Sequence, residues 1–267
     1  MTRLFPEAAP ALRFHARNAW FNVREQFSDL SSGVAGFLIF PFFIWLLSHL
    51  WNRFNSPFSS YNRIQVLEYV GITEILFLTF LRATTFTRAT GDFSLGLARP
   101  RSWLAFSFSG IFGRALGGRL IYLGIFILVL PPLGADWGGV VTAALRLLLL
   151  LPLLGVVQGL VALLFASSKV LWDQTSYFTL PVSKVFLVLG GVFAPLADYA
   201  EPWRRILLAL PPSDLFFQPA SFCVTGSFHG MSPAQWVGRI GVQIAVLWVL
   251  NQAFHRHARK NHRGHGG

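Results

Sequence analysis

Residues 190–219 read GGVFAPLADYAEPWRRILLALPPSDLFFQP, an apolar segment that is interrupted again and again. Five prolines lie in it, together with five charged side chains: Asp198, Glu201, Arg204, Arg205 and Asp214. Its hydrophobicity is otherwise high enough for it to enter a bilayer. Irregular backbone at membrane depth must be buried in protein or line a wet cavity, because an unpaired amide in lipid costs several kcal/mol. We therefore predict a re-entrant or extracytoplasmic region over residues 195–223.

The composition around this segment is typical of a membrane protein. Of the 267 residues 54% are hydrophobic and only 12% are charged, against roughly 25% charged in soluble domains. Several apolar runs reach the roughly 20 residues that cross the hydrocarbon core. We predict one all-α, polytopic transmembrane domain over residues 1–267, with six transmembrane helices at about 33–51, 64–81, 115–133, 143–167, 177–196 and 235–254.

The net charge is +11, and the distribution of the lysines and arginines along the chain predicts its orientation in the membrane. If both termini lie on one side of the membrane, sixteen of the 22 lysines and arginines lie on that side. The side richer in these residues is the cytoplasmic one. We therefore predict a multi-pass protein of the bacterial plasma membrane with both termini in the cytoplasm, in contact with lipid and with no nucleic acid partner.

Two segments outside the spans mix basic residues with other types. Residues 6–30 combine aromatic and basic side chains, which is typical of a helix lying in the membrane interface; a disordered basic tail is the alternative. Residues 255–267 read HRHARKNHRGHGG and predict a basic cytoplasmic tail against anionic lipid. A metal-binding tail is the other interpretation of its histidines.

The outer region itself predicts a short helix. Pro195 ends the fifth span, and WRRILLAL forms a half-inserted helix that Pro211 and Pro212 terminate. The predicted anchors of that helix at the membrane surface are Trp203, Arg204 and Arg205. An ordinary extracellular loop with one amphipathic helix is the alternative.

Motifs for catalysis are missing from the sequence. It has no G-x-x-x-x-G-K-[ST] phosphate loop, and no Ser/His/Asp or paired-carboxylate arrangement is legible from its spacing. We predict that the chain is not an enzyme, holds no cofactor or metal, and does not hydrolyse nucleotide by itself.

Two stretches resemble a known family. The first is GGVFAPLADYAEPWRRILLALPPSDLFFQPASF, which is similar to the outer re-entrant region of permease subunits of type-2 ATP-binding-cassette (ABC) exporters. The second is RATGDFSLGLARPRSW, residues 88–103, which resembles the family's cytoplasmic Gly-acidic and Leu-Leu-Arg-Pro pattern. This chain has Leu97, Ala98, Arg99 and Pro100 where the family often has that tetrapeptide.

The resemblance implies a permease subunit that forms a translocation path with a second, identical or similar subunit. Two cytoplasmic ABC ATPase subunits would bind the pair and carry ATP and Mg²⁺. The implied ATPase-coupling residues are Asp92, Leu97, Arg99 and Pro100. Their segment is also a short helix candidate, with Thr90 as its N-cap; a plain solvated loop is the alternative. An ion-coupled secondary transporter and a membrane-embedded lipid-modifying enzyme are the rival functions.

Two carboxylates in the second span are candidates for the translocation path. Glu68 and Glu74 are six residues apart, which turns them roughly 120° from each other on a helix, so each needs its own explanation. Carboxylates at this depth face a cavity or a cationic partner. Depth along the spans predicts Arg239 as the partner of Glu68 and Lys184 as that of Glu74. The functional alternative for Glu74 is a path that favours cationic or amphipathic cargo.

Overall fold

The computed structural model describes residues 8–28, 40–46, 49–50, 61–85, 103–171 and 176–264. In these ranges the chain is helical and has no strand. The longer helices are α1 (Ala8–Ser28), α3 (Arg63–Thr85), α5 (Trp103–Val129), α6 (Trp137–Leu171) and α11 (Pro233–Gly264). Between α6 and α11 lie α7 (Ser176–Leu189), α8 (Trp203–Ala209), α9 (Pro211–Leu215) and α10 (Phe217–Thr225).

Four helices, α3, α5, α6 and α11, are long and apolar enough to cross a membrane. They confirm an all-helical, multi-pass membrane protein, although they account for only four of the six predicted spans. Most of the first predicted span, 33–51, lies outside the described residues. The fifth, 177–196, is helical only up to Leu189, because α7 has 14 residues, about 21 Å, and stops at a double glycine.

The α5 helix begins at Trp103, twelve residues before the predicted start of its span. The added segment, WLAFSFSGIFGR, carries serine, glycine and arginine, which lowers its hydropathy. It is helical nonetheless because it packs against α1. Tertiary packing, rather than transfer into lipid, therefore sets this end of α5.

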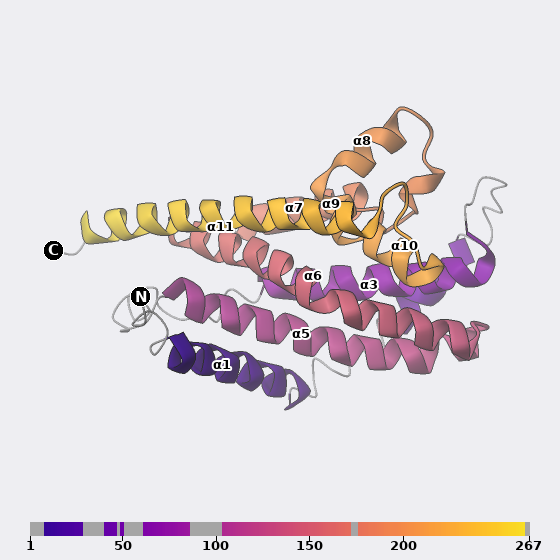
Figure 1. The fold of residues 1–267 in the computed structure, drawn as a ribbon, viewed down its shortest axis with the longest axis horizontal. Helices are drawn as coiled ribbons and strands as arrows, with labels where there is room; N and C mark the ends of the chain where they lie inside the picture. The colour runs from indigo at the N-terminus through magenta and orange to yellow at the C-terminus, as the bar shows by residue number, and fades with distance from the viewer. Residues whose placement is uncertain are drawn as a thin grey trace.

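The long helices lie side by side along the long axis of the molecule (Figure 1), with α3 at the centre. In the apolar 18-residue stretch of α3 that could span a membrane, 72% of the residues are buried, against 11% in the corresponding stretch of α11. The C-terminal half of α11 projects at one end of the bundle, where His255 stacks on Trp103 of α5. The α8 helix stands out near the other end.

The α1 helix confirms a helix within residues 6–30; its location in the membrane interface stays a prediction. It runs alongside the N-terminal half of α5, and Figure 1 shows both at the end where α11 projects. Two glycines of α5 permit this contact. A Cβ atom on Gly113 would lie 2.2 Å from the carbonyl oxygen of Ala19, and one on Gly117 would lie 3.1 Å from that of Val23.

We predict that Gly113→Ala destabilises the protein, whereas Gly124→Ala does not. Both glycines lie in α5, where alanine is the better helix former by roughly 1 kcal/mol. Gly124 has open space around its Cβ position. At Gly113 the methyl group would meet rigid backbone, so α1 must shift, at a cost of about 1–3 kcal/mol. Thermal unfolding in detergent measures the difference, and equal melting temperatures would contradict the close contact.

Candidate functional site

After α7 the chain turns back sharply and re-enters the bundle. We call residues 190–225 the returning segment. The turn requires glycine at both of its first positions: Gly191 has φ +73°, and a Cβ atom on Gly190 would lie 2.6 Å from the ring of Phe216. The backbone of this turn therefore lies against the start of α10, and substitution by any larger residue would push the two apart.

The returning segment reaches farthest from the N-terminal end of α3 at the junction of α9 and α10. The Phe216 ring packs against Phe77 and Phe80 of α3, at centroid distances of 6.2 and 5.8 Å. Phe77 lies about 21 Å from the N-terminal end of α3 at 1.5 Å per residue. From there α10 runs back along α3, so that Ser221 accepts a hydrogen bond from Tyr61, just before α3 begins. Residues 212–221 are all buried.

Side chains of the long helices donate to the carbonyl groups at the breaks of this segment. Tyr69 of α3 donates its hydroxyl to the carbonyl of Gly191, and Arg146 of α6 donates to that of Cys223 at 2.9 Å. Carbonyls in the last turn of a helix have no intrahelical partner. The breaks between the short helices are thus stabilised from outside the segment.

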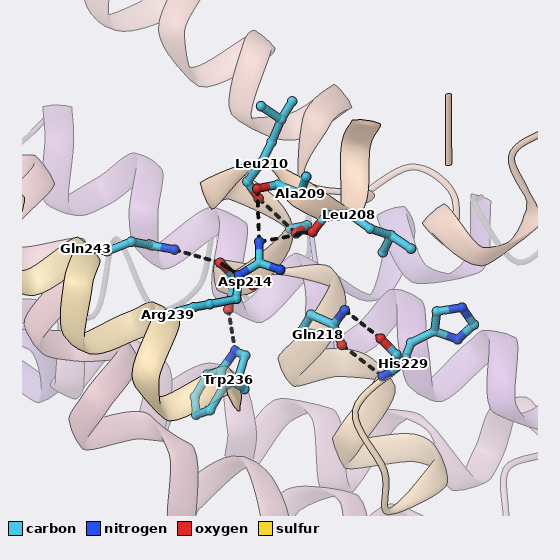
Figure 2. Close-up of polar contacts among 10 residues, drawn as sticks. Leu208, Ala209, Leu210, Asp214, Gln218, His229, Trp236, Arg239 and Gln243 are labelled. Carbon is cyan, nitrogen blue, oxygen red and sulfur yellow. Dashed lines mark hydrogen bonds and ion pairs between the residues drawn. The ribbon is translucent and has the colours of Figure 1, made fainter. Parts of the chain in front are cut away.

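A polar cluster joins α9 to α11 through Asp214 (Figure 2). Its Oδ2 atom accepts hydrogen bonds from Arg239 at 3.0 Å and from Gln243 at 2.7 Å. Arg239 also donates to the carbonyls of Leu208 and Ala209, which end α8, at 3.0 Å each. One guanidinium therefore binds α8 and α9 to α11.

The Asp214 side chain is 1% exposed, and its Oδ1 atom has no hydrogen-bond partner among the described residues. Burial raises the pKa of this carboxyl from 3.8 to about 6, although the charge and hydrogen bonds of Arg239 oppose the shift. The backbone carbonyl of Asp214 accepts the indole N–H of Trp236 at 3.1 Å. The α9 helix is thus held by three side chains of α11.

A second polar contact fixes the loop that follows α10. The Gln218 amide donates to the carbonyl of His229 at 3.0 Å and accepts the backbone N–H of the same residue at 2.9 Å (Figure 2). Phe228 stacks between Phe222 and Trp236, with ring centroids less than 5 Å apart. The loop between α10 and α11 is therefore an ordered part of the region.

The predicted residues of the outer region divide between buried and exposed positions. Pro195 and Pro212 are buried, whereas Pro211 is exposed and begins α9. The predicted helix is present as α8, but Trp203 is 63% exposed. Both Arg204 and Arg205 form ion pairs with Glu201, at 2.7 and 3.2 Å.

The predicted pair of Glu68 and Arg239 is wrong, because Arg239 binds Asp214. Glu68 is 5% exposed, and a Cβ atom on Gly139, in the first turn of α6, would lie 2.7 Å from its Oε1 atom. Asp136 and Arg146 are the charged groups that act on it most strongly. Equal depth in two spans was the basis of the prediction, and depth does not fix the direction in which a helix face points.

The predicted pair of Glu74 and Lys184 is also absent. Glu74 is 5% exposed and makes no ion pair or hydrogen bond within the described ranges. Lys184 lies on an exposed position of α7. Glu74 is therefore a buried carboxylate in a spanning helix, a costly placement that makes it a candidate functional residue.

A buried arginine was not identified as a site from the sequence. Arg119 of α5 is 0% exposed. It donates to the Gln158 side-chain oxygen, to the Thr79 hydroxyl at 3.3 Å and to the Leu151 carbonyl at 3.5 Å. No carboxylate pairs with it in the part of the chain that the structure describes. Its position inside a predicted span was the available signal.

The predicted coupling residues Asp92, Leu97, Arg99 and Pro100 lie outside the described residues. Of the predicted basic tail, the first part continues α11 as helix up to Gly264. Among the side chains that the structure describes, no three of His, Cys, Asp and Glu gather into a possible metal site.

Four apolar helices and a returning segment with fixed polar contacts define a multi-pass helical membrane protein. The chain matches no protein-family model and no curated protein sequence.

We predict that Arg239→Gln destabilises the protein by about 2 kcal/mol or more. The change leaves Asp214 buried beside an amide and removes the donor to the Ala209 carbonyl, whereas the Leu208 carbonyl keeps its hydrogen bond from Ser213. The cost stays below the roughly 3–5 kcal/mol of a fully buried pair because the Arg239 side chain is a third exposed. Arg205→Gln is the matched control, since this arginine is 84% exposed and such pairs contribute about 0–1 kcal/mol. Equal melting temperatures for the two variants would contradict the role of Arg239.

We predict that Asp214 makes stability depend on pH. Its folded pKa is raised, so its contribution is fully present below about pH 4 and is lost as pH rises through about 6. The free energy of unfolding should therefore fall less steeply between pH 4 and 7 in Asp214→Asn than in the wild type, by up to about 3 kcal/mol over the window. Melting temperatures across that pH range report this difference. Glu201→Gln, at an exposed carboxylate, should keep the wild-type slope; an unchanged slope in Asp214→Asn would refute the assignment.

Proposed function

We propose that this chain is the transmembrane subunit of an ABC exporter of the type-2 class. It forms the translocation path with a second permease subunit, identical or similar, and separate cytoplasmic ATPase subunits drive the pair. The chain lies in a bacterial plasma membrane, with both termini on the cytoplasmic side. ATP and Mg²⁺ bind the ATPase partners, and this chain itself holds no cofactor.

The observation that carries the proposal is the return of α9 and α10 into the bundle. The contact of Phe216 with Phe77 and Phe80 lies well over half of the way along α3. If α3 crosses the membrane, the returning segment re-enters it from the outer side. This agrees with the resemblance of residues 190–222 to the re-entrant region of these permeases. The match at residues 88–103 supports the same family.

The α3 helix supplies a mechanical link between the two matched segments. Its C-terminal end, Thr85, leads directly into the predicted coupling element. Its middle holds the returning segment through Tyr69 and the aromatic contacts of Phe77 and Phe80. Motion of an ATPase against the coupling element would therefore reach the outer region along one rigid helix. ATP binding favours one arrangement of the ATPases and so one conformation of the permease pair.

The test is purification of the tagged full-length chain from its native host in a mild detergent. An ABC ATPase subunit should copurify in equal amount with it, and the complex should hydrolyse ATP in a vanadate-sensitive reaction. If the chain is instead a secondary transporter or a lipid-modifying enzyme, no ATPase subunit should copurify with it and the purified sample should not hydrolyse ATP. ATP hydrolysis by the chain alone would also reject the proposal.

We predict that the double change Asp92→Asn and Arg99→Ala uncouples ATP hydrolysis from transport. The element would lose a carboxylate and a guanidinium that can bind the ATPase surface. Hydrolysis should continue while accumulation of a cationic amphipathic dye, such as ethidium, in inside-out vesicles stops. Arg63→Ala, at the opposite end of α3, is the control. Normal coupling in the double variant would count against residues 88–103 as the contact.

We predict that Glu74→Gln leaves the complex assembled but weakens dye transport several-fold. The amide keeps the shape of the side chain and removes the negative charge that would attract a cation. Since Lys184 does not pair with Glu74, the change strands no buried cation, and the melting temperature should not fall. Glu68→Gln is the matched comparison at a shallower position of the same helix. Wild-type transport in Glu74→Gln would remove Glu74 from the path.

A further inference from the structure

The α1 helix runs lengthwise along α5 rather than across it. Asn18 donates hydrogen bonds to the Phe106 carbonyl at 3.0 Å and to the Ser109 hydroxyl at 2.7 Å. One turn further along, Asn22 accepts a hydrogen bond from the Arg114 Nε atom at 2.8 Å. The partners in these three bonds are 88, 91 and 92 positions apart in the sequence. A nearly constant separation means that the two helices advance side by side in the same direction.

The contact between the two helices extends over several turns. It begins where the Phe14 ring packs against that of Phe106, with 6.1 Å between the centroids. It continues as far as Gly117, where a Cβ atom would lie 3.1 Å from the Gln26 side chain. From Phe14 to Gln26 the helix rises about 18 Å. Helices that cross at a large angle touch only near the crossing point, so the axes of α1 and α5 are close to parallel.

Part of this contact lies at membrane depth if α5 crosses the bilayer. The α5 helix ends at Val129, and about 20 residues span the hydrocarbon core, so the far boundary of the core falls near Gly110. Gly113 and Gly117, on which α1 packs, lie on the membrane side of that boundary. Small residues four positions apart are typical of helices that pack closely within a bilayer. The C-terminal end of α1 therefore enters the membrane beside α5.

The α1 helix also supplies a polar partner that α5 needs at this depth. Arg114 lies in the candidate span of α5. An arginine in a spanning helix is costly unless polar or charged groups surround it. Asn22 accepts its Nε–H, and the Glu25 carboxylate lies 3.9 Å from the same nitrogen. Without α1 this guanidinium would face acyl chains.

The face of α1 that points away from α5 mixes basic and aromatic side chains. Its exposed residues follow one line along the helix, because they are spaced alternately by four and three positions: Arg13, Arg17, Trp20, Arg24 and Phe27. A helix lying in the membrane plane separates basic and apolar side chains onto opposite faces. Here the two kinds share one face, which agrees with a helix that meets headgroups and acyl chains at different points along its length.

We propose that α1 stands upright against α5, with its axis close to the membrane normal, and docks its exposed face into one leaflet of the bilayer. That leaflet lies at the end of the bundle where α11 projects, which the distribution of lysines and arginines predicts to be cytoplasmic. Arg13 and Arg17 lie among the phosphate headgroups, whereas Trp20 and Phe27 lie progressively deeper. Arg24 reaches back toward the headgroups, because side chains lean toward the N-terminal end of a helix.

This orientation differs from the in-plane helix that the sequence predicts for residues 6–30. The difference arises because the composition of α1 reports that both basic and aromatic side chains are present, whereas the contacts with α5 fix the direction of its axis. The inference is independent of the exporter assignment, since it uses only α1, α5 and a bilayer.

The test places a nitroxide label on the full chain in phospholipid vesicles, at one position at a time. Arg13→Cys, Arg17→Cys, Trp20→Cys and Phe27→Cys follow the exposed line, and the native Cys223 is 1% exposed, so it should not react. Electron paramagnetic resonance then compares collisions of each label with oxygen, which concentrates among acyl chains, and with a water-soluble nickel complex. We expect the depth to increase at each step, by about 21 Å from the first position to the last.

The reference variant is Gly124→Cys, at an exposed position of α5 with open space around its Cβ atom, and its label should be deeper than every label on α1. Equal depths at the four α1 positions would overturn the proposal, because α1 would then lie in the membrane plane. Free collision of all four labels with the nickel complex would place α1 in water, and protection from both reagents would place it against protein; either result would also overturn the proposal. If Phe27→Cys is not monodisperse, Arg24→Cys takes its place, with the same expected order.

Discussion

Unpaired carbonyl groups at helix ends are the constraint on which this structure depends. Helices end at Leu189, Ala209, Leu215 and Thr225, and each break leaves carbonyls without an intrahelical partner. Ser213 and Thr225 satisfy some of them within the returning segment. Long helices supply further donors from side chains: α3 at the first break, α11 at the next two and α6 at the last. A chain of short helices can lie inside an apolar bundle only on this condition.

This arrangement explains why α3 is the buried helix and α11 is not. The α3 helix contacts α5, α6, α7 and α10, so its apolar surface is used on nearly every side. The α11 helix contributes one polar face near its start, formed by Trp236, Arg239 and Gln243, and packs along α6 with one side, while most residues of its apolar stretch stay exposed. The region near Asp214 is thus fixed by hydrogen bonds, whereas the region near Phe216 is fixed by aromatic packing. Changes at these two places should differ in their dependence on pH.

The sequence predicted the helices well and their contacts poorly. Apolar runs predicted a helix for each of the spans 64–81, 143–167 and 235–254, although α6 begins six residues earlier and α11 ends ten residues later than predicted. The prolines predicted the irregular segment, because composition acts locally. The pairs of Glu68 with Arg239 and of Glu74 with Lys184 failed, since position along a span gives depth but not the direction of a side chain. The sequence analysis left the charge of Asp214 in residues 190–219 unexplained. Its partner, Arg239, is 25 residues away and contacts it only because α9 folds against α11.

Unlike Asp214 and Arg239, the buried charges of Arg119 and Glu74 form no ion pair among the described residues, and this has a physical consequence. Arg119 is solvated by an amide, a hydroxyl and a carbonyl oxygen, all neutral, while Glu74 has no partner in the described part of the chain. A direct pair of two such groups would lower the cost of burial but would also neutralise both. Because Arg119 and Glu74 do not pair, the desolvation free energy of each charge must be offset by the packing around it. Natural chains retain such charges in spanning helices mainly where an ion or a polar group must pass or bind, and this is the physical basis for proposing Glu74 as part of a translocation path.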